Sequence, residues 1–138
     1  MFENYDLFST LIQLRPDGVA EAADRREALR GTDGSLWSVG AFHAEDDRAV
    51  HSDVWERHTR GHEVLVALSG TFRVHLRDEG LVATLTAGRS FIVPPGRWHR
   101  LAVEEPGDLL SITPRAGTEH EKADVAATRE PAKETAAP

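Results

Sequence analysis

The chain has 138 residues, 40% of them hydrophobic and 28% charged, with seven histidines and no cysteine. That length fits a single domain, and the lack of cysteine excludes disulfide frameworks, zinc fingers and iron–sulfur clusters. The formal net charge of -7 offers no basic surface to a phosphate backbone, so no nucleic-acid partner is expected. No apolar run approaches the roughly 20 residues of a membrane span, and acids rather than basic residues lie near the first Met. A cytoplasmic protein without a membrane partner is therefore predicted.

The first 33 residues are expected to form an N-terminal appendage, divided by an Arg-Pro-Asp-Gly turn at residues 15–18. Residues 6–14, before the turn, are apolar-rich and fit either a short helix or an edge strand. Residues 19–29 are rich in Ala, Glu and Arg, which favour a short surface helix. A second turn, at residues 32–35, separates this appendage from the rest of the chain.

Short apolar runs recur at intervals of roughly ten residues between residues 36 and 113, separated by Gly or Pro turns. Within residues 71–76, apolar side chains alternate with polar ones, as in a strand with one buried face, and His75 falls on the polar face. We therefore predict an all-β domain over residues 34–114, of the sandwich or barrel type.

The last segment, residues 115–138, is rich in Ala, Glu, Thr, Lys and Pro, with one Val and no aromatic residue. Such a segment buries too little apolar area to offset the entropy that ordering costs. We predict a flexible, disordered tail over these residues, and His120 falls within it.

Two segments of the predicted domain concentrate the candidate functional residues. In the first, Glu56 and His58 lie two positions apart, so on a strand their side chains share a face, and Glu63 begins the next strand after a loop. In the second, His99 follows a Pro-Pro-Gly turn and has the parity of Leu101. The imidazole of His99 is therefore expected to point into the apolar interior.

Two histidines and one carboxylate on facing strands can form a facial triad with open positions, which suits divalent Fe, Mn or Ni. Glu56 adds a second carboxylate, either as a fourth ligand through oxygen or as a general base. Without a metal, Glu56 and Glu63 would repel each other in a low-dielectric interior, and one would be driven toward its protonated form.

The two segments resemble the two conserved motifs of the cupin superfamily. The first motif reads His-x-His, three or four residues, Glu, six residues, Gly, and falls here on residues 56–70. The second reads Gly, five residues, Pro-x-Gly, two residues, His, three residues, Asn, and falls on residues 88–103. Two positions depart from the pattern, because Glu56 stands in place of the first His and Val103 in place of the Asn.

The resemblance implies a double-stranded β-helix, or jelly-roll, barrel that holds one divalent metal, here Fe, Mn, Ni or Zn. Carried over to this chain, it makes His58, Glu63 and His99 metal ligands, with Glu56 in the fourth ligand position. It also implies a small molecule in the barrel and a homodimer, for which the apolar segment Leu7–Leu14 is the candidate edge. Dioxygenase, isomerase and lyase activities fit such a site, and so does a non-enzymatic small-ligand binding or sensing module without metal.

Each candidate ligand also has a purely structural explanation. His99 could be held by backbone hydrogen bonds behind the turn, Glu56 and His58 could lie in a solvated acidic loop, and Glu63 could bond the adjacent loop. His62 is a rival ligand, but it precedes Glu63 by one residue and should face the opposite way, at the rim. Four arginines near the motifs either steer an anionic substrate or are solvated surface charges, namely Arg57, Arg60, Arg97 and Arg100.

Overall fold

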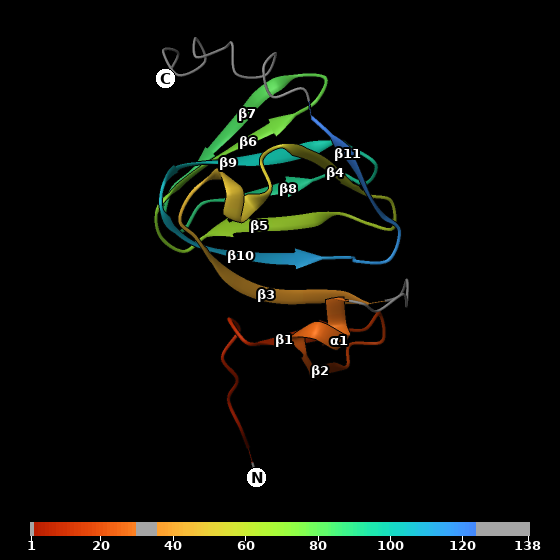
Figure 1. Cartoon of the computed structure of the whole chain (residues 1–138). Helices are drawn as coiled ribbons and strands as arrows, with labels where there is room; N and C mark the ends of the chain where they lie inside the picture. Colours follow the sequence, from red (N-terminus) through yellow and green to blue (C-terminus); the bar gives the residue numbers. More distant parts are fainter. Residues whose placement is uncertain (1, 30–35, 124–138) are drawn as a thin grey trace.

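A computed structural model describes residues 2–29 and 36–123, and its strands form two antiparallel sheets packed face to face (Figure 1). In order of neighbours, the six-stranded sheet contains β2 (Ala20–Asp24), β1 (Thr10–Leu14), β3 (Trp37–Ala44), β10 (Gly107–Thr113), β5 (Glu63–Ala67) and β8 (Ser90–Val93). The five-stranded sheet contains β11 (Thr118–Lys122), β4 (Val54–His58), β9 (His99–Glu105), β6 (Thr71–Leu76) and β7 (Gly80–Leu85). The prediction of an all-β jelly-roll barrel is confirmed.

Two short helices complete the described part of the chain, α1 (Arg25–Leu29) and the 3-10 helix η1 (Asp47–Val50). The side chain of Asp46 caps η1 by accepting hydrogen bonds from the backbone N–H groups of Arg48 and Ala49. Neither helix has the length and apolar character that crossing a membrane requires.

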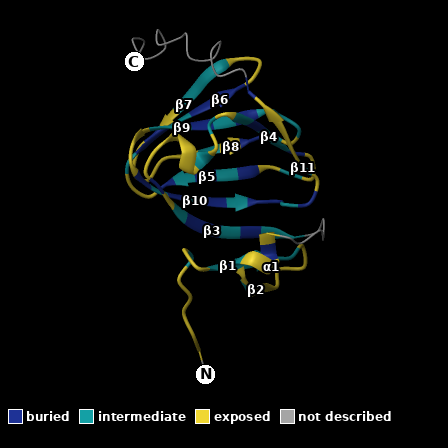
Figure 2. Cartoon of the chain, viewed as in Figure 1, coloured by how far each residue is buried: buried dark blue, intermediate teal, exposed yellow. Residues whose placement is uncertain are grey.

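The core lies between the two sheets, and buried positions alternate with less buried ones most regularly along β5 and β10 (Figure 2). The buried apolar side chains come from both sheets and comprise Ala44, Leu65, Ala67, Phe72, Val74, Leu85, Val93, Leu101 and Leu109. In β5, Glu63 shares the buried face with Leu65 and Ala67. The alternation that builds the core thus also turns one carboxylate toward the interior.

The N-terminal residues add a hairpin and a helix to the edge of the six-stranded sheet. Strand β1 confirms the strand alternative for residues 6–14. The helix prediction for residues 19–29 is right only for the second half, because the first half forms β2, paired with β1 from Thr10 opposite Asp24 to Leu14 opposite Ala20. Gly18, at φ +93, closes the turn between them, so cross-strand pairing outweighs the helix propensity of Ala and Glu.

The segment Leu7–Leu14 is predicted to form an edge of the sheet, and this prediction is wrong for its strand β1. It lies between β2 and β3, and Leu11 is buried. The free edge on this side of the sheet belongs to β2. The second predicted turn, at residues 32–35, lies outside the described residues, and so does the boundary predicted between residues 33 and 34.

The start of the predicted tail is a strand, so the prediction of disorder is wrong for residues 118–122. Strand β11 pairs with β4, from Thr118 opposite His58 to Lys122 opposite Val54. Composition missed it because this strand is polar and gains its order from pairing with a distant strand rather than from apolar burial. Residues 124–138 lie outside the described part of the chain.

Strand β6 departs from the simple alternation at one point. The pairing between β6 and β7 shifts register between Val74 and His75, and His75 is buried rather than on an exposed polar face. The predicted polar position of His75 is therefore wrong.

Candidate metal centre

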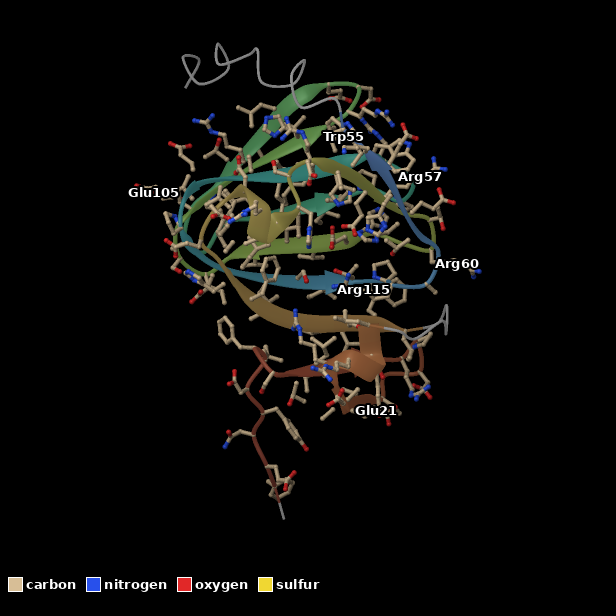
Figure 3. All side chains as sticks on the ribbon, viewed as in Figure 1. Glu21, Trp55, Arg57, Arg60, Glu105 and Arg115 are labelled. Carbon is tan, nitrogen blue, oxygen red and sulfur yellow. The ribbon has the colours of Figure 1, made fainter. Side chains whose placement is uncertain are left out.

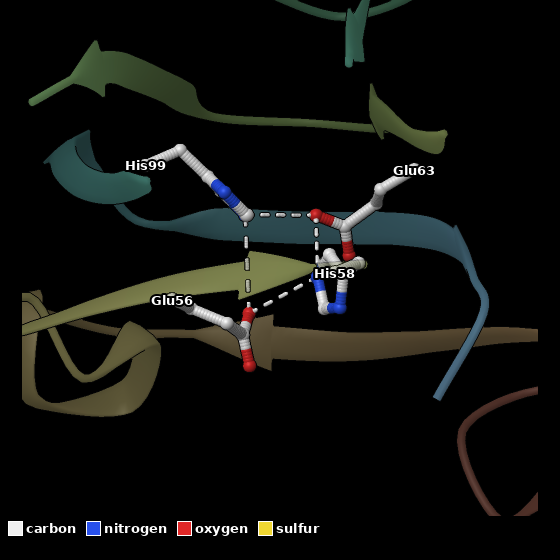
Figure 4. Close-up of side chains that lie close together, drawn as sticks. All are labelled: Glu56, His58, Glu63 and His99. Carbon is white, nitrogen blue, oxygen red and sulfur yellow. Dashed lines mark hydrogen bonds and ion pairs between the residues drawn. The ribbon is translucent and has the colours of Figure 1, made fainter. Parts of the chain in front are cut away.

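Four side chains converge inside the barrel, and they are the predicted set Glu56, His58, Glu63 and His99 (Figure 4). Each offers one ligand atom, and the four atoms all lie within 4.8 Å of one another. The predicted convergence of these four side chains is therefore observed. That they bind a metal stays a prediction.

Three strands from both sheets position this cluster. Glu56 and His58 occupy alternate positions near the end of β4, and His99 begins the neighbouring strand β9, directly opposite Glu56. Glu63 begins β5 in the facing sheet. The cluster thus bridges the two sheets. His99, some forty residues later in the chain, meets the first motif because β9 pairs with β4.

Burial separates Glu56 from the other three residues. His58, Glu63 and His99 are only 1%, 5% and 3% exposed. The side chain of Glu56 is 29% exposed. A carboxylate with partial access to solvent can exchange partners, whereas the three buried groups are fixed by their surroundings. The expectation of a solvated acidic loop for Glu56 and His58 is therefore wrong for His58.

The inner atoms form a closed ring in which imidazole nitrogens alternate with carboxylate oxygens (Figure 4). His99 Nε2 lies 3.0 Å from Glu63 Oε1 and 3.9 Å from Glu56 Oε1. His58 Nε2 lies 3.3 Å from Glu63 Oε1 and 3.5 Å from Glu56 Oε1. The two contacts of His58 are at ion-pair distance but do not count as hydrogen bonds. The buried Nε2 of His58 therefore has no hydrogen-bond partner among the described residues.

The outer atoms of the same side chains are held by hydrogen bonds from behind. His58 Nδ1 lies 2.9 Å from Thr118 Oγ1, and His99 Nδ1 lies 3.2 Å from the carbonyl oxygen of Arg97. Thr113 Oγ1 donates to Glu63 Oε2 at 2.7 Å. These bonds fix the orientation of each ring and carboxylate and leave the other atom facing the centre.

This arrangement fits a divalent metal. An imidazole that donates its Nδ1 proton to an oxygen, as His99 does to the Arg97 carbonyl, can turn the lone pair of Nε2 toward the centre. The unpartnered, buried Nε2 of His58 is the atom that a metal would satisfy. Two imidazole nitrogens and two carboxylate oxygens suit Fe, Mn, Ni or Zn.

The histidines change the charge state expected for the two carboxylates. Burial opposes the charge of Glu63 and Glu56, but the adjacent His58 outweighs this and lowers the pKa of both below the usual range. Burial likewise opposes a charge on His58, yet the two carboxylates beside it raise its pKa to about 9. The prediction that one glutamate would be driven toward protonation is wrong, because the imidazole between the carboxylates favours the charged form of both.

Two further histidines were assigned from the sequence, His120 wrongly and His62 correctly. His120 Nε2 lies 2.9 Å from Glu56 Oε2, although His120 was assigned to a disordered tail. Only the pairing of β11 with β4, which sets His120 opposite Glu56, reveals this contact. His62 is exposed and lies outside the cluster, as its parity with respect to Glu63 predicts.

A cavity of about 490 Å³ adjoins the cluster and is lined by Glu56, Glu63 and His99. Its apolar walls are formed by Leu11, Phe42, Val50, Val54, Leu65, Leu101 and Leu109. The cavity is thus amphipathic, with the polar cluster on one part of an apolar lining, as in many small-molecule sites.

Of the four arginines predicted near the motifs, only Arg100 lines this cavity. Figure 3 shows Arg57 and Arg60 on the outside of the barrel. Arg57 is paired there with Glu119, and Arg97 is paired with acids of the β6–β7 turn. For these three, surface charge is the observed outcome.

Residues 48–113 match the family model described as the cupin domain, so this chain is a cupin-domain protein. Among solved structures, it is similar to a double-stranded β-helix protein from Klebsiella pneumoniae, at 21% identity and a TM-score of 0.50 over 64% of this chain and 70% of that one. This likeness concerns the fold alone.

Two further solved structures are similar at lower TM-scores. A cupin-2 domain protein from Shewanella frigidimarina shares 25% identity, with a TM-score of 0.46 over 57% of this chain and 71% of that one. A cupin-like protein from Thermotoga maritima shares 15% identity, with a TM-score of 0.49 over 67% of this chain and 84% of that one. No curated protein matches the sequence.

Proposed function

We propose that this protein is a metal-dependent cupin that acts on a small molecule held in the barrel cavity. Glu56, His58, Glu63 and His99 would hold one divalent metal, and the reaction would be of the dioxygenase, isomerase or lyase type. The observation that carries the proposal is the convergence of four ligand atoms within 4.8 Å, with the buried Nε2 of His58 left without a hydrogen bond among the described residues.

A bound metal would supply Lewis-acid or redox chemistry at its open positions. The chain itself supplies a base, because Glu56 lines the cavity and is the most accessible member of the cluster. Its Oε2 is held by His120, and its Oε1 faces the centre. Glu56 can therefore act either as fourth ligand or as a general base that takes a proton from a molecule in the cavity.

A second candidate is a non-enzymatic module that binds or senses a small ligand, with metal absent or structural. The charges of the cluster favour it, since a protonated His58 already offsets part of the negative charge of the two carboxylates beside it. In such a protein the four residues would join the two sheets, and the cavity would hold the effector.

Elemental analysis of the full chain, purified without a His tag, tests the first function. We expect close to one divalent metal per chain, and we expect His99→Ala to abolish its uptake. His62→Ala is the matched control, because that exposed histidine lies outside the cluster. A wild-type protein that is metal-free, and whose fold and ligand binding survive chelation, would favour the second function. Retained binding in a folded Glu63→Gln variant would contradict the ligand set.

We also propose a homodimer, formed through the N-terminal residues. Most of the exposed large apolar side chains among the described residues lie there: Phe2, Tyr5, Phe8, Val19 and Leu29. Strand β2 next to them has one edge that no described strand pairs with, and this edge can pair with a second copy. Sedimentation of a single species near twice the chain mass is expected, and a monomer at micromolar concentration would contradict the proposal.

A further inference from the structure

Three arginines line the cavity beside the candidate metal centre. Arg25 comes from α1, Arg100 from β9, and Arg115 from the segment that follows β10. The acids on the same lining are Glu56 and Glu63. Three arginines therefore share the lining with two glutamates.

The cavity is thus positive within a chain whose net charge is -7. A divalent metal on the two carboxylates would make it more positive, and the lining histidines can only add positive charge. A positive pocket in an acidic protein attracts anions and repels cations. The charge distribution therefore indicates an anionic occupant.

Arg25 and Arg115 each hold a buried nitrogen without a hydrogen-bond partner in the described residues. These atoms are Nη1 of Arg25 and Nε of Arg115. Arg100 donates to Ser52 Oγ at 3.2 Å, and its guanidinium carbon lies 5.2 Å from the ring centroid of Trp55. A buried, unsatisfied N–H group is costly, so an acceptor inside the cavity would stabilise Arg25 and Arg115.

The sheet beneath Arg25 leaves space for its side chain. Gly40 of β3 lines the cavity, and a Cβ atom there would lie 3.5 Å from Arg25 Nη1 and 2.3 Å from Leu11 Cδ2. Gly40 pairs with Ser111 of β10, the strand after which Arg115 follows. Arg25 thus lies near β3, Arg115 follows the neighbouring strand β10, and β5, which carries Glu63, is the next strand in the sheet.

We propose that the cavity binds a small organic acid whose acid group is held by Arg25 and Arg115. The apolar body of the acid would pack against residues such as Phe42 and Leu109, and its far end would reach the candidate metal centre. This inference rests on the proposed function, because the acid is the molecule presented to the metal.

The guanidinium group selects the chemistry of the ligand. Its planar fork donates two parallel hydrogen bonds to a carboxylate or a phosphonate, and such charged bonds are stronger than neutral ones. A neutral amide of the same shape has fewer acceptor positions and no charge, and an amine would be repelled. An acid should therefore bind far better than its amide.

Calorimetric titration of the full chain, after incubation with Mn(II), tests this site. The probes are benzoate, phenylacetate and phenylphosphonate, with benzamide as the neutral match of benzoate. We expect at least one acid to bind, and benzoate to bind about 10-fold or more tightly than benzamide. The preferred probe distinguishes a carboxylate from a phosphonate as the acid group.

Variants assign the binding to the two arginines. Arg25→Gln and Arg115→Gln are each expected to weaken binding of the preferred acid about 10-fold or more. Arg25→Lys should be intermediate, because it keeps the charge but loses the fork. Arg26→Gln is the matched control, since Arg26 is the exposed neighbour on the same helix. Arg25 lies on a peripheral helix, so its variant tests the site even where the Arg115 variant fails to fold.

The possible negative outcomes distinguish the anion-site proposal from the metal proposal. Equal binding of benzoate and benzamide, unchanged binding in both glutamine variants, or no binding of any acid at about 10 mM overturns the anion site. Such a failure with normal metal content leaves the metal proposal intact. Conversely, acid binding that depends on Arg25 in a protein that takes up none of Mn(II), Fe(II), Ni(II) and Zn(II) supports the anion site and overturns the metal proposal.

Discussion

The inner strands of the barrel and its outermost strand β11 are held by different forces. Strand β6 buries Phe72 and Val74 completely in the core. Strand β11 exposes most of its residues and is attached by pairing with β4 and by the ion pairs of Glu119 with Arg57 and of Glu121 with Arg77. Apolar burial thus builds the barrel, and polar pairing adds to it.

Functional groups divide in the same way. The inner strands carry the four candidate ligands, and the added elements carry some of the groups that hold or complement them. Strand β11 supplies Thr118 behind His58 and His120 behind Glu56. Helix α1 supplies Arg25 to the cavity. The comparison shows that the motif residues of the barrel supply the candidate ligands, whereas less apolar segments outside the core, such as α1 and β11, supply groups around them.

The largest effect is expected from the core. Phe72→Ala should lower the free energy of unfolding by about 3–5 kcal/mol, because a fully buried aromatic side chain is replaced by a cavity. Ile92→Ala is the control, since Ile92 is 57% exposed and should cost little. Urea unfolding monitored by tryptophan fluorescence measures both. Similar losses in the two variants would contradict the assignment of the core.

The cluster should make stability depend on pH in the metal-free protein. The pKa of His58 rises from 6.5 to about 9 on folding, so its proton stabilises the folded state fully below about pH 6.5. This contribution, about 3 kcal/mol, should be lost as the pH rises through about 9. Unfolding free energies of chelated protein between about pH 6 and pH 10 measure it. His58→Gln should remove this dependence, and an unchanged profile in that variant would contradict it.

Truncation compares the polar strand with the core directly. A chain ending at Arg115 lacks β11 and the ion pairs of Glu119 and Glu121, and its Tm should fall on the order of 5 °C. A chain ending at Ala123 keeps β11 and is the matched control. Equal Tm values for the two truncated chains would mean that β11 adds nothing to stability.

The smallest effect concerns the support of one candidate ligand. Thr118→Val removes the hydroxyl that holds His58 Nδ1 and should weaken metal binding about 10-fold, because the ring loses its fixed orientation. Glu119→Gln, the next position along the strand, should leave metal affinity unchanged. Competition with a fluorescent chelator measures both affinities. Equal affinities in the two variants would show that Thr118 does not position the ring.

The sequence by itself determined the barrel and the members of the cluster. Apolar alternation is local and survives in a linear pattern, so β5 and β6 were predictable, and the parity of Glu56, His58, Glu63 and His99 follows from it. The motif spacing added the expectation that these residues meet across the two sheets.

Only the tertiary structure decided what surrounds that cluster. The polar strand β11 is ordered by a partner some sixty positions earlier in the chain, with Thr118 opposite His58, which no local pattern encodes. The charge state of the two glutamates depends on His58 standing within ion-pair distance of both. Likewise, Arg25 shares the cavity with Glu63 only because the N-terminal hairpin continues the sheet beside β3. Distances between residues remote in sequence set all three, and such distances exist only in the folded chain.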